Sequence, residues 1–108
     1  MELARVEGTV VSTVKADRLK GYKLLVIHLL KPDTTPTGSH VVAVDTVGAG
    51  NGEIVIAVRG SSARQTADLS NVPTDTSIVA IVDSIEYQGK IVFRKTPLKD
   101  KSDEIRTN

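Results

Sequence analysis

The sequence predicts an all-β protein that folds as one small closed β-barrel. The chain has 108 residues, a length that normally forms a single domain. Short segments rich in valine, isoleucine and threonine alternate with segments rich in glycine, proline, aspartate and serine, which is the pattern of strands joined by turns. One stretch, just after residue 60, carries the start signal of a helix. We therefore expect one short helix, placed after the fourth strand, in an otherwise β-stranded domain.

Each expected strand rests on its side-chain pattern. Residues 3–14 alternate apolar and polar side chains around Gly8, which predicts a strand bent at that glycine. The next three strands are short apolar runs that end at turn-forming residues. The last two strands are joined across Gln88-Gly89, a hairpin signal. The six strands are expected at residues 3–14, 22–30, 40–47, 53–58, 77–87 and 90–95.

The segments between these strands have the composition of turns and loops. Residues 15–21 are polar and predict a turn, residues 34–39 predict a loop, and residues 68–76 predict an irregular connection. Ser61 and Ser62 stand before Ala-Arg-Gln, where a serine hydroxyl caps the first turn of a helix. Six short strands and one small helix describe a barrel resembling the oligonucleotide-binding (OB) fold.

Four runs in these strands are apolar at nearly every position, although a sheet with one solvated face should alternate apolar and polar residues. Both faces of such strands must be covered, and one short helix cannot cover them. Neighbouring subunits in a cyclic assembly are the expected source of the missing cover. The runs are residues 24–27, 41–44, 54–58 and 78–82.

Composition argues against nucleic-acid-binding, secreted and membrane-spanning proteins. The 14 Lys and Arg residues nearly balance the 13 Asp and Glu residues, and one Phe and two Tyr are the aromatic residues. Single-strand nucleic-acid binding needs a basic groove and stacking aromatic side chains, so it is disfavoured. There is no Cys, no signal-peptide pattern and no apolar run of about 20 residues. We expect a cytoplasmic chain that does not cross a membrane.

Gly48, Gly50 and Gly52 alternate with other residues, which indicates a loop with a tightly specified path. The third glycine is not at the spacing that a dinucleotide fingerprint requires. The loop also leads into a strand instead of a helix N-terminus. No Lys-Ser/Thr pair follows it, as a P-loop requires. We therefore expect no nucleotide and no other cofactor at this loop.

The candidate catalytic and metal-binding residues have stronger structural interpretations. Gly60-Ser61-Ser62 lacks the second glycine of a hydrolase nucleophile elbow, so helix capping is favoured for both serines. His28 and His40 are the two histidines, and neither has a neighbouring ligand at metal spacing in the sequence. We expect no catalytic residue and no metal ligand.

Three carboxylates stand at the ends of apolar runs or within them: Asp45, Glu53 and Asp83. Nothing in the sequence places two of them together in a cleft, as acid–base catalysis would need. We interpret them as acceptors for loop N–H groups or as partners of an arginine such as Arg59 or Arg64.

Two blocks make the chain recognisable. Residues 45–53 read DTVGAGNGE and residues 58–65 read VRGSSARQ. At this spacing they resemble the pattern of the EutN/CcmL family, the pentameric vertex proteins of bacterial microcompartments. The resemblance covers about residues 1–95, expected to form the barrel domain. Residues 96–108 are a charged tail beyond the shared barrel, expected to be flexible.

The resemblance implies a structural protein without enzymatic activity. Members form homopentamers that cap the fivefold vertices of a cytoplasmic polyhedral shell, whose facets are tiled by hexameric shell proteins. The first block matches a loop expected near the ring axis or at a subunit contact: Gly48, Ala49, Gly50, Asn51, Gly52 and Glu53. The second block matches a segment expected at the subunit interface: Gly60, Ser61, Ser62, Ala63 and Arg64.

Two rival functions remain open at the level of sequence. The same fold could serve as a single-stranded nucleic-acid-binding module, against which the balanced charge and scarce aromatic residues argue. A small hydrolase using Ser61 or Ser62 would need a general base that the sequence does not pair with either serine.

Overall fold

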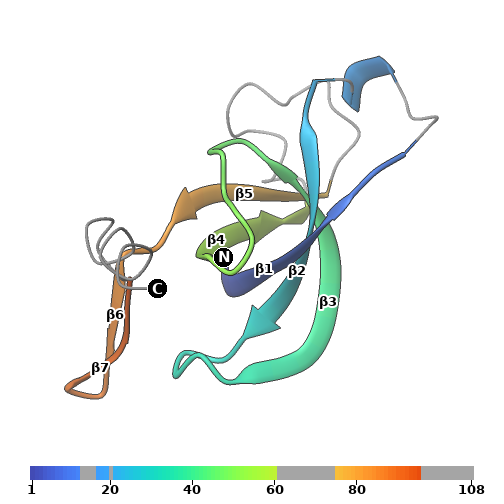
Figure 1. The fold of residues 1–108 in the computed structure, drawn as a ribbon. Helices are drawn as coiled ribbons and strands as arrows, with labels where there is room; N and C mark the ends of the chain where they lie inside the picture. The colour runs from blue at the N-terminus through green and yellow to red at the C-terminus, as the bar shows by residue number, and fades with distance from the viewer. Residues whose placement is uncertain (13–16, 20, 61–74, 96–108) are drawn as a thin grey trace, which may run out of the picture.

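The protein is a closed five-stranded β-barrel with a two-stranded hairpin beside it (Figure 1). This computed structural model describes residues 1–12, 17–19, 21–60 and 75–95. Within them the strands are β1 (Glu2–Val10), β2 (Lys23–Leu30), β3 (Pro36–Asp45), β4 (Ile54–Arg59), β5 (Thr76–Ile81), β6 (Ser84–Tyr87) and β7 (Lys90–Arg94), and the 3-10 turn η1 spans Asp17–Leu19. No helix in these residues is long and apolar enough to span a bilayer.

The barrel closes in the strand order β1-β2-β3-β5-β4, with β4 returning to β1. Neighbouring strands are antiparallel except β3 and β5, which are parallel and pair Val44 with Ser77 and Asp45 with Ile78. Full closure removes the exposed edges of the sheet. The predicted class, an all-β closed barrel resembling the OB fold, is confirmed.

The core fills the barrel interior with side chains from alternate positions of the strands, as the two-residue period of a strand requires. Its buried members are Ala4, Val6, Leu25, Ile27, Leu29, Ala43, Ala49, Val55, Ala57 and Ile78. A second, smaller cluster packs Leu19, Tyr22 and Leu24 against the buried Val44. Part of the two-faced apolar pattern is therefore covered within the chain, whereas Val42 remains 50% exposed.

The predicted bend in the first strand is confirmed. The register of β1 against β2 shifts between Val6 and Gly8, which leaves Glu7 as the extra residue of a β-bulge. A bulge kinks its strand and redirects a side chain. Here the redirected side chain is that of Glu7, which contacts histidines on β2 and β3.

The predicted loop at residues 34–39 is wrong from residue 36 onward, because β3 begins at Pro36. Proline fits the first position of a strand, where no backbone N–H is needed. Thr37 then donates its hydroxyl to the Leu29 carbonyl at 2.8 Å, which fastens the start of β3 to β2. Composition alone suggested a loop, but pairing with β2 extends the strand.

The predicted strand at residues 77–87 is divided into β5 and β6, so the described chain has seven strands and not six. The Val82 N–H still donates to the Ile54 carbonyl of the barrel at 2.8 Å. The backbone carbonyl of Asp83, in contrast, accepts from the Lys95 N–H at 2.7 Å. The backbone thus changes partner at Asp83-Ser84, two polar residues after the apolar run of β5, and β6 and β7 form a separate sheet.

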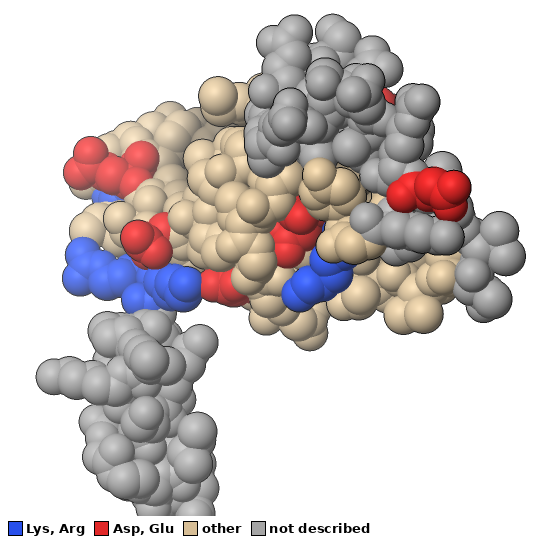
Figure 2. Space-filling view, turned by 90° about the horizontal axis from the view of Figure 1, so that it is seen from above, with Lys and Arg blue, Asp and Glu red and all other residues tan. Residues whose placement is uncertain are grey.

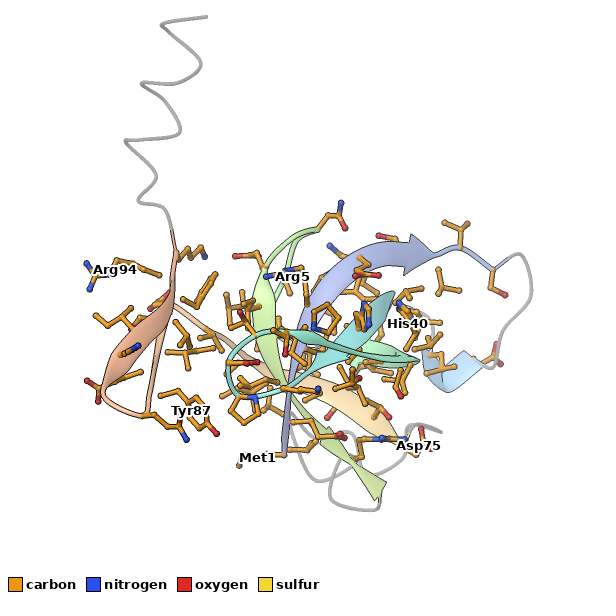
Figure 3. All side chains as sticks on the ribbon, turned by 90° about the horizontal axis from the view of Figure 1, so that it is seen from below. Met1, Arg5, His40, Asp75, Tyr87 and Arg94 are labelled. Atoms are coloured by element: carbon orange, nitrogen blue, oxygen red, sulfur yellow. The ribbon has the colours of Figure 1, made fainter. Side chains whose placement is uncertain are left out.

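The predicted hairpin turn at Gln88-Gly89 is confirmed. Both residues have positive φ, 54° and 78°, as a two-residue type I′ turn requires. Tyr87 and Arg94 lie on this hairpin, away from the barrel (Figure 3). The short helix predicted after the fourth strand and the tail at residues 96–108 lie outside the described residues.

Candidate functional site

The glycine loop, residues 46–53, connects β3 to β4 and lies across β1. The Gly52 N–H donates to the Val6 carbonyl at 2.8 Å, and the Val6 N–H donates to the Glu53 carbonyl at 2.9 Å. Ala49 is fully buried and belongs to the barrel core. The loop is therefore anchored to the barrel by both its backbone and its central side chain.

Asp45, at the end of β3, holds the first half of the loop. One carboxylate oxygen accepts from the N–H groups of Val47 and Gly48, both at 3.1 Å, and the other accepts from the Ala49 N–H at 3.0 Å. The Asp45 residue is only 7% exposed. A short carboxylate at a strand end can accept several loop amides at once, since each oxygen has two lone pairs.

Glu53 holds the second half of the loop. Its Oε1 accepts from the Gly50 N–H at 2.6 Å, and its Oε2 accepts from Lys95 Nζ, also at 2.6 Å. The hydrogen bond with Glu53 is the largest cause that raises the pKa of Lys95 above its ordinary value. Glu53 thus ties the glycine loop to the residue that follows β7.

Asp45 and Glu53 confirm the interpretation that the carboxylates accept from loop N–H groups. Arg59, named as a possible partner for one of them, instead contacts Glu2, with Nη1 at 3.3 Å from Oε2. The carboxylates and neighbouring carbonyls engage these loop N–H groups inside the chain, whereas a phosphate-binding loop directs its N–H groups at the ligand.

Gly48 and Gly52 take φ values of 78° and 87°, a region that side chains with a Cβ adopt at a cost. Gly50 has no such requirement: its φ is not positive, and an added Cβ would make an ordinary contact, 3.4 Å from Glu53 Oε1. Gly48 and Gly52 therefore allow the two turns that the loop needs.

Glu53, the last residue of the first block, stands directly before β4, and Gly60 of the second block directly after it, so these two residues lie about 20 Å apart for a six-residue strand. Gly60 has a φ of 76°, and its N–H donates to the Asp75 carbonyl at 2.8 Å, which closes the neck of the segment between β4 and β5. The remaining residues of the second block, Ser61, Ser62, Ala63 and Arg64, lie outside the described residues.

A groove lies between the glycine loop and the end of β7. It has a volume of about 240 Å³ and is lined by Asn51, Gly52, Glu53, Ile54, Val82, Phe93, Arg94 and Lys95. On the described surface seen in Figure 2, basic and acidic side chains lie close together instead of forming a continuous basic stripe. Such a surface lacks the electrostatic footprint of a nucleic-acid site.

Glu53→Ala is expected to lower the free energy of unfolding by about 1–3 kcal/mol, because the Gly50 N–H loses its acceptor in a partly buried loop. Lys95→Met removes another partner of Glu53, but the Lys95 side chain is 36% exposed and water can reach the ion pair, so a smaller loss is expected. Urea unfolding of both variants at one protein concentration measures the difference. Equal losses would mean that the ion pair, and not the Gly50 hydrogen bond, stabilises the loop.

One cluster was not predicted from the sequence: Glu7 lies between His28 and His40 on the outside of the barrel. The only signal available in sequence was the presence of two histidines on neighbouring strands. The contact itself depends on strand register and on the bulge at Glu7.

Comparison with known proteins gives one consistent result. Residues 1–83 match the model of the family described as ethanolamine utilisation protein EutN/carboxysome. The chain is 54% identical over 86 residues to the bacterial microcompartment shell vertex protein GrpN of Rhodospirillum rubrum (strain F11), covering 80% of this chain and 97% of that protein.

Solved structures agree with the sequence comparison. The GrpN pentameric microcompartment shell protein from Rhodospirillum rubrum superposes with a TM-score of 0.74 at 54% identity, covering 81% of this chain and 99% of that one. The CcmL structure of Nostoc sp. PCC 7120 superposes with a TM-score of 0.82 at 41% identity, covering 88% and 100%. The closed barrel, the glycine loop braced by Asp45 and Glu53, and these matches together show that the chain belongs to the EutN/CcmL family.

Proposed function

We propose that this chain is a structural shell protein that forms homopentamers and caps the fivefold vertices of a bacterial microcompartment. The observation that carries the proposal is the 54% identity to a relative whose solved structure is described as a pentameric microcompartment shell protein. Two further groups of relatives are named as shell vertex proteins, EutN and CcmL.

The physical task of such a protein is curvature. Flat layers of hexameric shell proteins cannot close into a polyhedron without fivefold points, so the partners of the ring are further copies of this chain and the hexamers around it. The proposed location is the shell of a microcompartment in the cytoplasm. No catalytic role is proposed, because the loop amides that could stabilise an anion are used internally.

The two sequence blocks are proposed to serve assembly. Residues 48–53 are the proposed axis loop or subunit contact, supported by a rigid loop whose tip is exposed at Gly48 and Asn51. Residues 60–64 are the proposed subunit interface, supported by the match of residues 58–65 to the family pattern. Residues 1–95 are proposed as the barrel domain and residues 96–108 as a flexible tail.

Native mass spectrometry of the purified protein tests the proposal. A mass of five chains that does not change with protein concentration is expected for a closed ring. A stable monomer that binds single-stranded oligonucleotides with strong salt dependence would overturn it and favour the nucleic-acid module.

Arg64→Glu is expected to weaken the ring, because it reverses a charge in the proposed interface block. Lys31→Glu, the same charge reversal at an exposed position after β2, is the matched control and is expected to keep the five-chain mass. Dilution series followed by native mass measure both variants. An Arg64→Glu ring that resists dilution as well as the control would remove this residue from the interface.

A further inference from the structure

Three side chains on the outside of the barrel form a compact group that the proposed shell function does not use. His28 on β2 pairs in register with Arg5 on β1 and with His40 on β3. Glu7, the bulge residue of β1, reaches the two histidines. Figure 3 places His40 among the side chains of the barrel strands, far from the β6–β7 hairpin.

The group is tightly convergent. Glu7 Oε2 lies 2.9 Å from His28 Nδ1, and Glu7 Oε1 lies 3.1 Å from His40 Nε2. The imidazole centroids are 4.0 Å apart. One ligand atom from each of the three side chains can be chosen so that all lie within 4.8 Å of one another. Small side-chain rotations would bring such atoms to a common centre.

The surroundings also suit a metal ion. The His28 side chain is only 14% exposed, so its position is set by packing, whereas Glu7 and His40 are 41% and 47% exposed and leave access from solvent. Ligands on three adjacent strands of a closed barrel are held more accurately than ligands on loops.

We propose that Glu7, His28 and His40 form a binding site for a divalent transition-metal ion such as Zn²⁺. Two imidazole nitrogens and one carboxylate oxygen are a common protein donor set for zinc, with water in the fourth position. The same set is poor for Mg²⁺ and Ca²⁺, which prefer oxygen ligands throughout. The site lies within one chain, so it does not depend on the proposed ring.

Metal binding changes one hydrogen bond. In the metal-free chain the Gly38 N–H donates to His28 Nε2 at 3.1 Å, so the proton of the neutral ring is on Nδ1, facing Glu7. When a metal ion binds Nδ1, the proton of the neutral imidazole is on Nε2. The Nε2–H group and the Gly38 N–H are then two donors facing each other, and they cannot form a hydrogen bond. Gly38 is exposed at the start of β3 with a φ of 90°, so its peptide can move away. Arg5 is the neighbouring charge that opposes a cation, and the Glu7 carboxylate offsets it.

Calorimetric titration of the tag-free, metal-stripped protein with ZnCl₂ tests the site. The expected result is saturable binding of one ion per chain that excess Mg²⁺ does not displace. His40→Gln and Glu7→Gln are each expected to weaken binding at least about tenfold. Glu86→Gln, on the exposed face of β6, is the matched control and is expected to bind as the unchanged chain does.

A second readout separates this site from binding elsewhere. In proton–nitrogen NMR spectra, Zn²⁺ is expected to shift the Gly38 amide and the His28 and His40 ring signals before other signals move. His28 is largely buried, so its substitution could disturb folding. The substitutions are therefore made at the more exposed His40 and Glu7. A dissociation constant weaker than about 1 mM, or unchanged binding by both His40→Gln and Glu7→Gln, would overturn the proposal.

Discussion

Asp45→Ala is expected to lower the free energy of unfolding by about 3 kcal/mol or more. The substitution leaves the N–H groups of Val47, Gly48 and Ala49 without their acceptor, and an unsatisfied buried donor costs about 1–3 kcal/mol. Ala49 is fully buried, so water cannot replace the carboxylate there. Asp45→Asn keeps one acceptor oxygen and should lose less than Asp45→Ala.

Urea unfolding at a fixed protein concentration measures this loss, since the stability of an assembled ring depends on concentration. Asp33→Ala is the matched control. Its carboxylate also accepts from a backbone N–H and a hydroxyl, both of Thr35, but in an exposed turn. A much smaller loss is expected there, because water can take over both hydrogen bonds. Equal losses for the two variants would show that the glycine loop rearranges and finds other acceptors.

The role of Asp45 could be predicted from the sequence. A short carboxylate directly before a glycine-rich loop has few uses other than accepting from the loop amides, and the structure confirms that use. The barrel class was also within reach, because apolar periodicity and turn residues mark the strands locally. Both predictions depend on residues that are close together in the chain.

The Glu7–His28–His40 group could not be predicted from the sequence, because its members are not close together in the chain. These residues are far apart in sequence, and they meet only because His28 faces His40 in register and a bulge redirects Glu7. A shift of one residue in register would send a strand's side chains to the other face. The division of residues 77–87 has a related cause: Asp83-Ser84 marks where the pairing partner changes from β4 to β7, but two polar residues inside a strand-like segment do not show which strand the chain pairs with next.

Ile78→Ala is expected to lower the free energy of unfolding by about 2–5 kcal/mol, the usual range for a buried isoleucine. Ile78 is fully buried in the barrel core. It also lies at the parallel seam between β3 and β5, where it pairs with Asp45. Its carbonyl accepts from Thr46 Oγ1 at 2.7 Å, so the seam is reinforced by a side chain at the start of the glycine loop.

Ile91→Ala is the matched control, because Ile91 on β7 is 55% exposed, and a change within about 0.5 kcal/mol is expected. Hydrogen exchange adds a local readout for the Gly48 and Ala49 amides, which Asp45 holds. If the seam positions the loop, Ile78→Ala speeds their exchange beyond the global loss of stability, and Thr46→Val does so with a smaller global loss. Exchange that follows global unfolding in both variants would mean that Asp45 holds the loop without help from the seam.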